Sequence, residues 1–167
     1  MIEIRTVKQH DSPKVFQEFM SELIDEDVYI RMDKKPTLKE QKEWLEGMKK
    51  KIRAKQVVWL CAWHGKKQIA TVRAEKGLWN ERNNVDIGIS VLKKYRGKGL
   101  GEKLLRDILR LAREKLKPKN IYLSVAAPNK PAINLYKKLG FRIFAKFPNW
   151  AHKGKRFFDV YYMILKK

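Results

Sequence analysis

The sequence predicts one α/β domain built around a mixed sheet. Segments that alternate apolar and polar residues, as strands do, are interleaved with segments whose apolar residues recur at helical spacing. No repeat, linker or low-complexity tract interrupts the 167 residues, and the hydrophobic fraction of 44% is that of a globular protein. We therefore expect a single domain over residues 1–167, with about seven strands and about four helices in the order β-α-α-β-β-β-α-β-α-β-β.

The first half of the chain predicts a strand, two helices and three further strands. Residues 2–7 alternate like a strand, and apolar side chains follow at helical spacing between Lys14 and Ile24. Thr37 is the expected N-cap of the second helix, with Glu40 as its capping-box partner. The expected ranges are a strand at 2–7, helices at 14–24 and 38–55, hairpin strands at 56–63 and 69–75 around a turn at 64–68, and a strand at 83–92.

The second half predicts two more helices and three strands. Apolar side chains form a broad helical stripe from Leu100 to Ala112 among charged residues. A shorter helix is expected between the cap Asn129 and the terminating Gly140, with Pro131 tolerated in its first turn. The expected strands are 120–125, 141–147 and 156–165, and the last two flank a loop at 148–155.

The net charge of +21 is unevenly distributed. Residues 57–167 hold 26 Lys and Arg against 7 Asp and Glu, so they carry nearly all of the excess. Such a potential favours a polyanionic partner, which includes nucleic acid, a membrane surface or a phosphate-rich cofactor. The alternative is that the lysines mainly keep the protein soluble.

Several classes of protein are disfavoured by composition. The one cysteine, Cys61, excludes an internal disulfide and a cysteine-based metal cluster, and its apolar surroundings predict a buried thiol. No apolar run approaches the ~20 residues that cross a bilayer, and the N-terminus lacks the apolar stretch of a signal peptide. We expect a cytoplasmic protein without a membrane segment or a metal site.

The stretch YRGKGLGEKLL (95–105) places Gly97, Gly99 and Gly101 after an expected strand and at the start of an expected helix. The first amides of a helix have no intrahelical partner and lie at the positive end of its dipole, so they bind phosphate oxygens. The spacing matches neither the dinucleotide fingerprint nor the Walker loop. The stretch predicts a phosphate site, with a tight turn as the alternative. Positive charge is added by Arg96, Lys98 and Lys103.

Two separate segments carry recognisable motifs. In VDIGISVLKKYRGKGLGEKLL, the pattern [Q/R]-x-x-G-x-[G/A] is filled by Arg96, Gly99 and Gly101. In NKPAINLYKKLGF, the pattern N-x-x-A-x-x-L-Y-x-x-x-G-F is matched by Asn129, Ala132, Leu135, Tyr136, Gly140 and Phe141. With this order of elements, the chain resembles the GNAT superfamily of N-acetyltransferases over nearly its whole length. The resemblance implies a single GNAT-type domain with a mostly antiparallel, twisted sheet, and an enzyme that uses acetyl-CoA without a metal.

The resemblance also implies how the donor is held. The amides of residues 96–101 would take the pyrophosphate, and the backbone at Val91 and Leu92 would pair with the pantetheine arm as a neighbouring strand does. A backbone amide there is the implied oxyanion donor. Asn129 either contacts the coenzyme or simply caps its helix. The residues assigned to the coenzyme are Val91, Leu92, Arg96, Gly97, Lys98, Gly99, Leu100, Gly101, Asn129 and Tyr136.

The implied chemistry needs a base and an acid, because in a ternary complex an amine attacks the thioester and the coenzyme leaves as a thiolate. Tyr136 is the implied acid, with a core aromatic as the alternative. Asp86 stands near the place where many relatives carry a glutamate base, and Glu75 and His152 are the other candidates. Ser124 stands where relatives that acetylate protein N-termini often carry glutamate, which disfavours that subtype.

The family pattern places the acceptor between the first two helices, the strand at 83–92 and the loop joining the last two strands. A cluster of carboxylates in SELIDEDVY predicts attraction of a cationic amine such as a polyamine, with a solvated acidic turn as the alternative. These carboxylates are Glu22, Asp25, Glu26 and Asp27. Trp150 in the far loop is expected to close over the acceptor.

Two other functions stay open. A protein acetyltransferase, acting on a ribosomal-protein N-terminus or a lysine, would share the donor site. A basic nucleic-acid-binding module would keep the scaffold and lose the chemistry, with Trp79 and Trp150 as stacking aromatics, but it would not need the glycine loop or Tyr136. Association with nucleic acid or the ribosome, and a homodimer, stay open as well.

Overall fold

A computed structural model describes residues 1–26 and 28–166, within which seven strands, four α-helices and two short 3-10 turns form. The strands are β1 (Ile2–Thr6), β2 (Val57–His64), β3 (Lys67–Lys76), β4 (Asn84–Val91), β5 (Asn120–Ala126), β6 (Phe141–Lys153) and β7 (Arg156–Leu165). The helices are α1 (Pro13–Asp25), α2 (Leu38–Arg53), α3 (Leu100–Leu116) and α4 (Lys130–Lys138). The predicted order of elements is confirmed.

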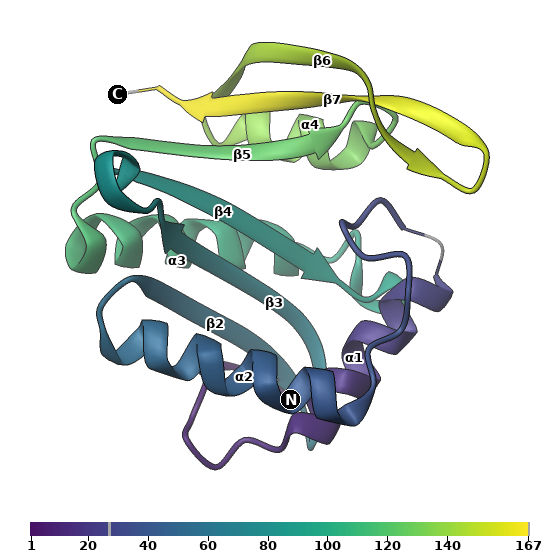
Figure 1. The fold of residues 1–167 in the computed structure, drawn as a ribbon, viewed down its shortest axis with the longest axis vertical. Coiled ribbons are helices and arrows are strands. Elements are labelled where there is room, and N and C mark those ends of the chain that lie inside the picture. Colours follow the sequence, from purple (N-terminus) through teal and green to yellow (C-terminus); the bar gives the residue numbers. More distant parts are fainter. Residues whose placement is uncertain (27, 167) are drawn as a thin grey trace.

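All seven strands form one sheet in the order β1-β2-β3-β4-β5-β7-β6 (Figure 1). Every neighbouring pair is antiparallel except β4 and β5, which are parallel. Helices α1 and α2 lie on one face of the sheet, and α3 and α4 lie on the other (Figure 1). The prediction of a mixed, mostly antiparallel sheet flanked by helices is confirmed.

The helix caps and the buried helix face that the local sequence predicted are present in the structure. The Thr37 hydroxyl accepts from the Glu40 amide at 3.2 Å, and the Glu40 carboxylate accepts from the Thr37 amide at 2.7 Å, which completes the capping box. Asn129 caps α4 by accepting from the Ala132 amide at 3.4 Å. The apolar stripe of α3 is buried against the sheet and consists of Leu100, Leu104, Leu105, Ile108, Leu109, Ala112 and Leu116.

The loop predicted at 148–155 is wrong over most of its length, because β6 continues to Lys153. Pro148 is compatible with a strand here because β6 is the edge of the sheet, where a missing N–H need not break a ladder bond. A bulge between Phe147 and Ala151 absorbs the irregularity that the turn residues introduce.

Connections in the first part of the sheet also differ from the prediction. The turn between β2 and β3 is shorter than 64–68, with only Gly65 and Lys66 between the paired strands. Two 3-10 turns that the periodicity did not reveal occupy residues 79–81 and 93–95. The second of these leads directly into the glycine stretch.

Strands β4 and β5 run side by side only at their beginnings. Their parallel register ends at the pair Asp86–Tyr122, after which the strands diverge (Figure 1). The Leu92 amide donates to a β3 carbonyl at 3.0 Å. Because the direction of hydrogen bonding alternates along an antiparallel ladder, Ile89 and Val91 direct their backbone groups the other way, toward the gap between β4 and β5.

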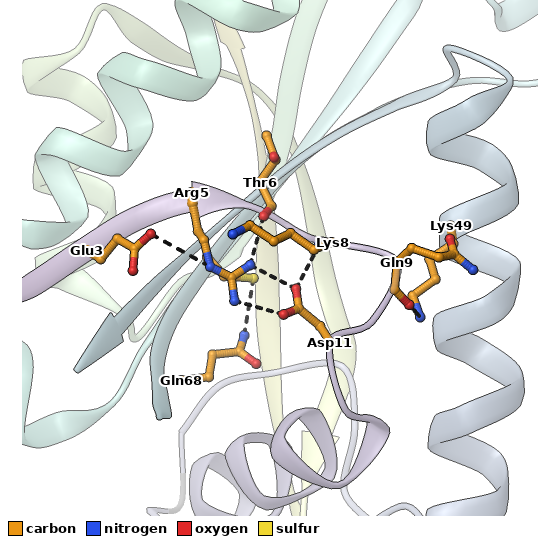
Figure 2. A network of polar contacts seen from close by, with 9 residues as sticks. Glu3, Arg5, Thr6, Lys8, Gln9, Asp11, Lys49 and Gln68 are labelled. Carbon is orange, nitrogen blue, oxygen red and sulfur yellow. Dashed lines mark hydrogen bonds and ion pairs between the residues drawn. The ribbon is translucent and has the colours of Figure 1, made fainter. Parts of the chain in front are cut away.

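The segment between β1 and α1 is held by a buried ion pair (Figure 2). Arg5 donates two hydrogen bonds to Asp11, at 2.7 and 2.9 Å, and the Lys8 amide donates a third at 2.7 Å. Burial alone would raise the pKa of Asp11, but these hydrogen bonds outweigh it and lower the pKa. The network therefore fixes the path by which the chain enters α1.

Candidate active site

The glycine stretch connects β4 to α3 and presents a row of backbone amides. Within the described part of the chain, the amides of the six residues from Gly97 to Glu102 have no hydrogen-bond partner. The Lys103 amide is the first to bond back, to the Gly99 carbonyl at 3.0 Å. Because these unpaired groups lie at the positive end of a 17-residue helix, they form a site that favours phosphate oxygens.

Backbone conformation accounts for two of the three glycines. Gly97 and Gly99 have φ of +70° and +78°, a region that residues with a side chain disfavour. A Cβ at either position would meet no atom within 4 Å, so the space beside the amides is open to a ligand. A Cβ at Gly101 would lie 3.5 Å from the Leu135 side chain, where α3 packs against α4. The stretch therefore fits a pyrophosphate that lies along its amides.

Arg96 is placed differently from the other residues of the glycine stretch. Its amide donates to the Lys93 carbonyl at 3.1 Å, and its guanidinium donates to the Val91 carbonyl at 2.7 Å and to the Glu26 carboxylate at 2.5 Å. Glu26 also accepts from the Lys93 amide at 2.8 Å. Glu26, which the sequence assigned to the acceptor, thus joins the end of α1 to the segment that leads into the glycine stretch.

Val91 and Leu92, both assigned to the pantetheine arm, face in different directions. The Leu92 side chain is fully buried, its amide bonds to β3, and its carbonyl accepts from the Tyr95 amide at 2.9 Å. The Val91 amide is directed into the gap between β4 and β5, beyond the end of their register. Of the two, only Val91 can offer an amide to a ligand in the gap.

Tyr136 lies on the buried side of α4, with its ring centroid 6.0 Å from that of Phe141. Among the described residues its hydroxyl has no hydrogen-bond partner. Burial, with a contribution from the charge of Asp86, raises the pKa of Tyr136 to about 12. The hydroxyl therefore stays protonated at neutral pH and can donate a proton.

Asp86 lies where β4 and β5 part. Its Oδ2 is 3.7 Å from Arg31 Nη2, and its Oδ1 is buried without a partner among the described residues. Burial raises the pKa of Asp86, and the guanidinium groups of Arg31 and Arg73 offset this only in part. A carboxylate with an unsatisfied buried oxygen and a raised pKa is suited to accept a proton.

Residues 16–141, which are most of the chain, match the sequence model of the acetyltransferase (GNAT) family. The chain belongs to that family. Two solved structures show the same fold: an acetyltransferase of the GNAT family from Streptococcus pneumoniae, and a GNAT superfamily phosphinothricin acetyltransferase from Sinorhizobium meliloti in complex with acetyl-CoA. The first has a TM-score of 0.87 at 24% identity, covering 98% of both chains. The second has a TM-score of 0.81 at 18% identity, covering 98% of this chain and 86% of the other.

Curated relatives of this GNAT-family chain match parts of it. An N-alpha-acetyltransferase of Sulfurisphaera tokodaii is 45% identical over 56 residues, 34% of each chain. The L-amino acid N-acetyltransferase AaaT of Escherichia coli is 33% identical over 82 residues, 49% of this chain and 51% of that protein. A spermine/spermidine N(1)-acetyltransferase of Bacillus subtilis is 38% identical over 65 residues, 39% of each. The chain thus spans between a third and a half of the length of these relatives.

The described carboxylates at the end of α1 in this GNAT-family protein, of which Glu26 is the C-cap, are already paired. Their partners, at 2.5–2.7 Å, are Lys67 for Glu22, Lys35 for Asp25 and Arg96 for Glu26. Asp27, the fourth carboxylate of the predicted cluster, lies outside the described residues. The charge that was expected to attract a cationic acceptor is therefore compensated by basic groups of the chain itself.

The other predicted site residues are less closely connected to the gap. Glu75 forms an ion pair with Lys51 at 2.5 Å, so its carboxylate is already engaged. His152 Nδ1 lies 3.1 Å from a backbone carbonyl in the β6–β7 hairpin. Trp150 is 61% exposed, and its ring packs on Phe147 at a centroid distance of 4.8 Å. Of the candidate bases, Asp86 is the one that lies at the end of the β4–β5 register.

Arg31 is a site residue that the sequence reasoning missed. It comes from the connection between α1 and α2 and donates to the Ser124 hydroxyl at 2.9 Å, beside its contact with Asp86. Arg31 and Ser124 are 93 positions apart in the chain. The family pattern marked the position of Ser124, but no motif or periodicity marks Arg31. Only the folded arrangement brings them to the same place.

Two further properties of the described part of the chain bear on its chemistry. No group of His, Cys, Asp and Glu side chains in it could hold a metal ion, and no helix in it is long and apolar enough to cross a membrane. Cys61 is fully buried, and burial raises the pKa of its thiol to about 12, as expected for a core cysteine.

Proposed function

We propose that this protein is an N-acetyltransferase that transfers the acetyl group of acetyl-CoA to a primary amine. The observation that carries the proposal is the row of unpaired amides at the start of α3, which opens beside the gap between β4 and β5. Asp86 lies at the end of the β4–β5 register, and its charge contributes to the raised pKa of Tyr136, so the two groups have the protonation properties of a base and an acid that act together. Membership of the GNAT family supports acetyl-CoA as the donor.

Each residue then has a defined part. The amides of residues 97–102 hold the pyrophosphate, and the Val91 amide donates to the thioester oxygen as charge develops on it. Asp86 takes a proton from the acceptor ammonium, because only the neutral amine has a lone pair for attack. The N–C bond forms, the C–S bond breaks, and Tyr136 gives its proton to the departing sulfur.

The proposed acceptor is a small primary amine. Relatives named for spermine/spermidine and for L-amino acids support this class, whereas the relative named N-alpha-acetyltransferase supports a protein N-terminus as the second candidate. The polyamine form of the proposal drew on the acidic residues of α1. Since the described members of that cluster are ion-paired, they no longer favour a polycation over other amines.

Calorimetric titration with acetyl-CoA tests the donor site first. We expect saturable, near-stoichiometric binding that persists at moderate salt and is lost in Gly99→Glu, because the new carboxylate would lie beside the amides that bind phosphate. Gly65→Glu is the matched control, since Gly65 also has a positive φ, of +59°, and open space around it, but it lies in the β2–β3 turn. This control separates the loss of the phosphate site from backbone strain and added charge.

Thiol release with a panel of free amines and short peptides then tests the transfer. Release with free amines supports the proposal, and a preference for peptides would favour the second candidate. Weak binding that fades with salt and is unaffected by Gly99→Glu would refute the donor site. The +21 chain would then be tested against oligonucleotides as a nucleic-acid-binding module.

A further inference from the structure

Arg31 is poorly satisfied for an arginine that lies beside a candidate catalytic carboxylate. Its side chain is 71% exposed, with one hydrogen bond to the neutral Ser124 hydroxyl and a contact of 3.7 Å with Asp86, which is too long for a hydrogen bond. A guanidinium has five N–H donors in a planar fork that matches a carboxylate. Arg31 therefore keeps most of its donors available.

Asp86 is poorly satisfied in a complementary way. Its Oδ1 is buried and makes no full hydrogen bond with the described residues, although the Ile87 amide is close enough to lower the pKa of the carboxyl. The side chain as a whole is 30% exposed, so a ligand ammonium can reach the carboxylate from its exposed side and offset the cost of its partial burial. A cationic group that can bind a carboxylate, Arg31, thus lies beside an anionic group that can bind an ammonium, Asp86.

The floor next to these two groups is aromatic. Tyr122 is the register partner of Asp86, and Ser124 is the partner of Tyr162, so all four side chains project from the same face of the sheet. The rings of Tyr122 and Tyr162 stack at a centroid distance of 6.3 Å, and Phe147 packs on Tyr162 at 5.2 Å. Such a floor suits an apolar side chain.

We infer that the acceptor is an α-amino acid, whose carboxylate pairs with Arg31, whose amino group lies against Asp86 and whose side chain packs on Tyr122 and Tyr162. The short distance between the two charged groups decides the class. Amino and carboxylate groups attached to one Cα fit a guanidinium and a carboxylate that are 3.7 Å apart. A polyamine lacks an anionic group for Arg31, and a peptide N-terminus replaces the carboxylate with a neutral amide.

This inference rests on the proposed acetyl transfer, and one panel tests the two separately. The acceptors are L-phenylalanine, L-leucine, L-leucinamide, spermidine and a short peptide, each with acetyl-CoA and thiol release as the readout. Leucinamide keeps the side chain and the amine of leucine and removes only the negative charge. Its amine is also less basic than that of leucine, so a preference for leucine cannot come from easier deprotonation.

We expect kcat/KM for leucine to exceed that for leucinamide by at least about tenfold, as one charge-assisted ion pair implies. Arg31→Met should lower kcat/KM for leucine roughly 10- to 100-fold, mainly through KM. The value for leucinamide should fall by a clearly smaller factor, which reflects only the altered pKa of Asp86 once the guanidinium is gone. The kcat/KM of Arg31→Lys for leucine should lie between those of the wild type and Arg31→Met, because lysine keeps the positive charge and loses the planar guanidinium that binds a carboxylate with two hydrogen bonds. Arg110→Met is the matched control, since Arg110 on α3 is similarly exposed, at 60%, and also makes one ion pair.

Binding of L-phenylalanine in the presence of coenzyme A, followed by calorimetry, adds a readout that needs no turnover. It should be detectable in the wild type and lost in Arg31→Met. Equal rates with leucine and leucinamide, an equal loss of both in Arg31→Met, or a preference for spermidine or peptide would overturn the inference while leaving acetyl transfer in place. No thiol release with any acceptor would overturn the proposed function as well.

Discussion

Glu26→Gln tests whether the end of α1 serves the donor or the acceptor. The sequence pattern placed Glu26 among acceptor-binding carboxylates, whereas the fold places it on Arg96 and on the Lys93 amide, just ahead of the glycine stretch. The substitution keeps an oxygen that can accept from the amide but removes the charge that pairs with the guanidinium. If Glu26 holds the loop in place, the variant should weaken binding of acetyl-CoA.

The magnitude follows from the environment of the pair. The Glu26 side chain is 13% exposed and that of Arg96 is 41% exposed, so water screens part of their interaction, and the value of a charge-assisted hydrogen bond is reduced to about 1 kcal/mol. Because Gln keeps part of this interaction, we expect a loss of about 0.5–1 kcal/mol. If all of it is expressed in binding, the Kd for acetyl-CoA rises roughly 2- to 5-fold.

Calorimetry of acetyl-CoA binding and steady-state kinetics in both substrates provide the assay. Glu22→Gln is the control, since Glu22 lies one turn earlier on α1 and pairs with Lys67 instead of the loop. We expect that control to leave the Kd for acetyl-CoA unchanged. A rise in KM for the amine, with the Kd for acetyl-CoA unaffected, would refute the bracing role and restore Glu26 to the acceptor site.

Two further substitutions separate the catalytic groups from the core. Tyr136→Phe should lower kcat about 10²- to 10⁴-fold, because the buried hydroxyl, whose pKa is raised to about 12, is the proposed proton donor. The free energy of unfolding should change little, and an unchanged kcat would show that Tyr136 is only a core aromatic. Asp86→Asn should lower kcat by a similar factor and abolish the acidic limb of the pH profile. Because burial raises the folded-state pKa of Asp86 above its ordinary value, the wild type should lose stability relative to this variant as the pH rises through that pKa. Urea unfolding of both proteins from pH 4 to 8 measures this, and a stability difference that does not change with pH would contradict it.

Elements governed by local chemistry could be predicted from the sequence. The Thr37–Glu40 capping box, the buried stripe of α3 and the Asn129 cap depend on residues three or four positions apart, so their signals are contained in short windows. The length of β6 could not be predicted in this way. Pro148 marks a turn by itself, and it is compatible with a strand only because β6 forms the edge of the sheet, which is a property of the whole topology.

The direction of each backbone amide was another property that the sequence motif did not contain. Val91 and Leu92 are adjacent, and both fell within the segment expected to hold the pantetheine arm. Which of the two faces the gap depends on the pairing of β3 with β4, because a shift of one residue in that register would exchange their roles. The motif therefore identified the segment, whereas the β3–β4 register determines that Val91, and not Leu92, directs its amide toward the gap.

In the acceptor region, the number of acidic residues in the sequence predicts substrate preference less well than the ion pairs that those residues form in the fold. The carboxylates of α1 suggested a cationic substrate, but each described member is compensated by a basic group of the chain. Arg31, one basic residue among many in a +21 protein, has no such full compensation and lies against the unsatisfied Asp86. Since a charge that is already paired contributes little to binding, the preference of the site should follow Arg31 and Asp86, and therefore a zwitterion, rather than the acidic cluster that is more conspicuous in the sequence.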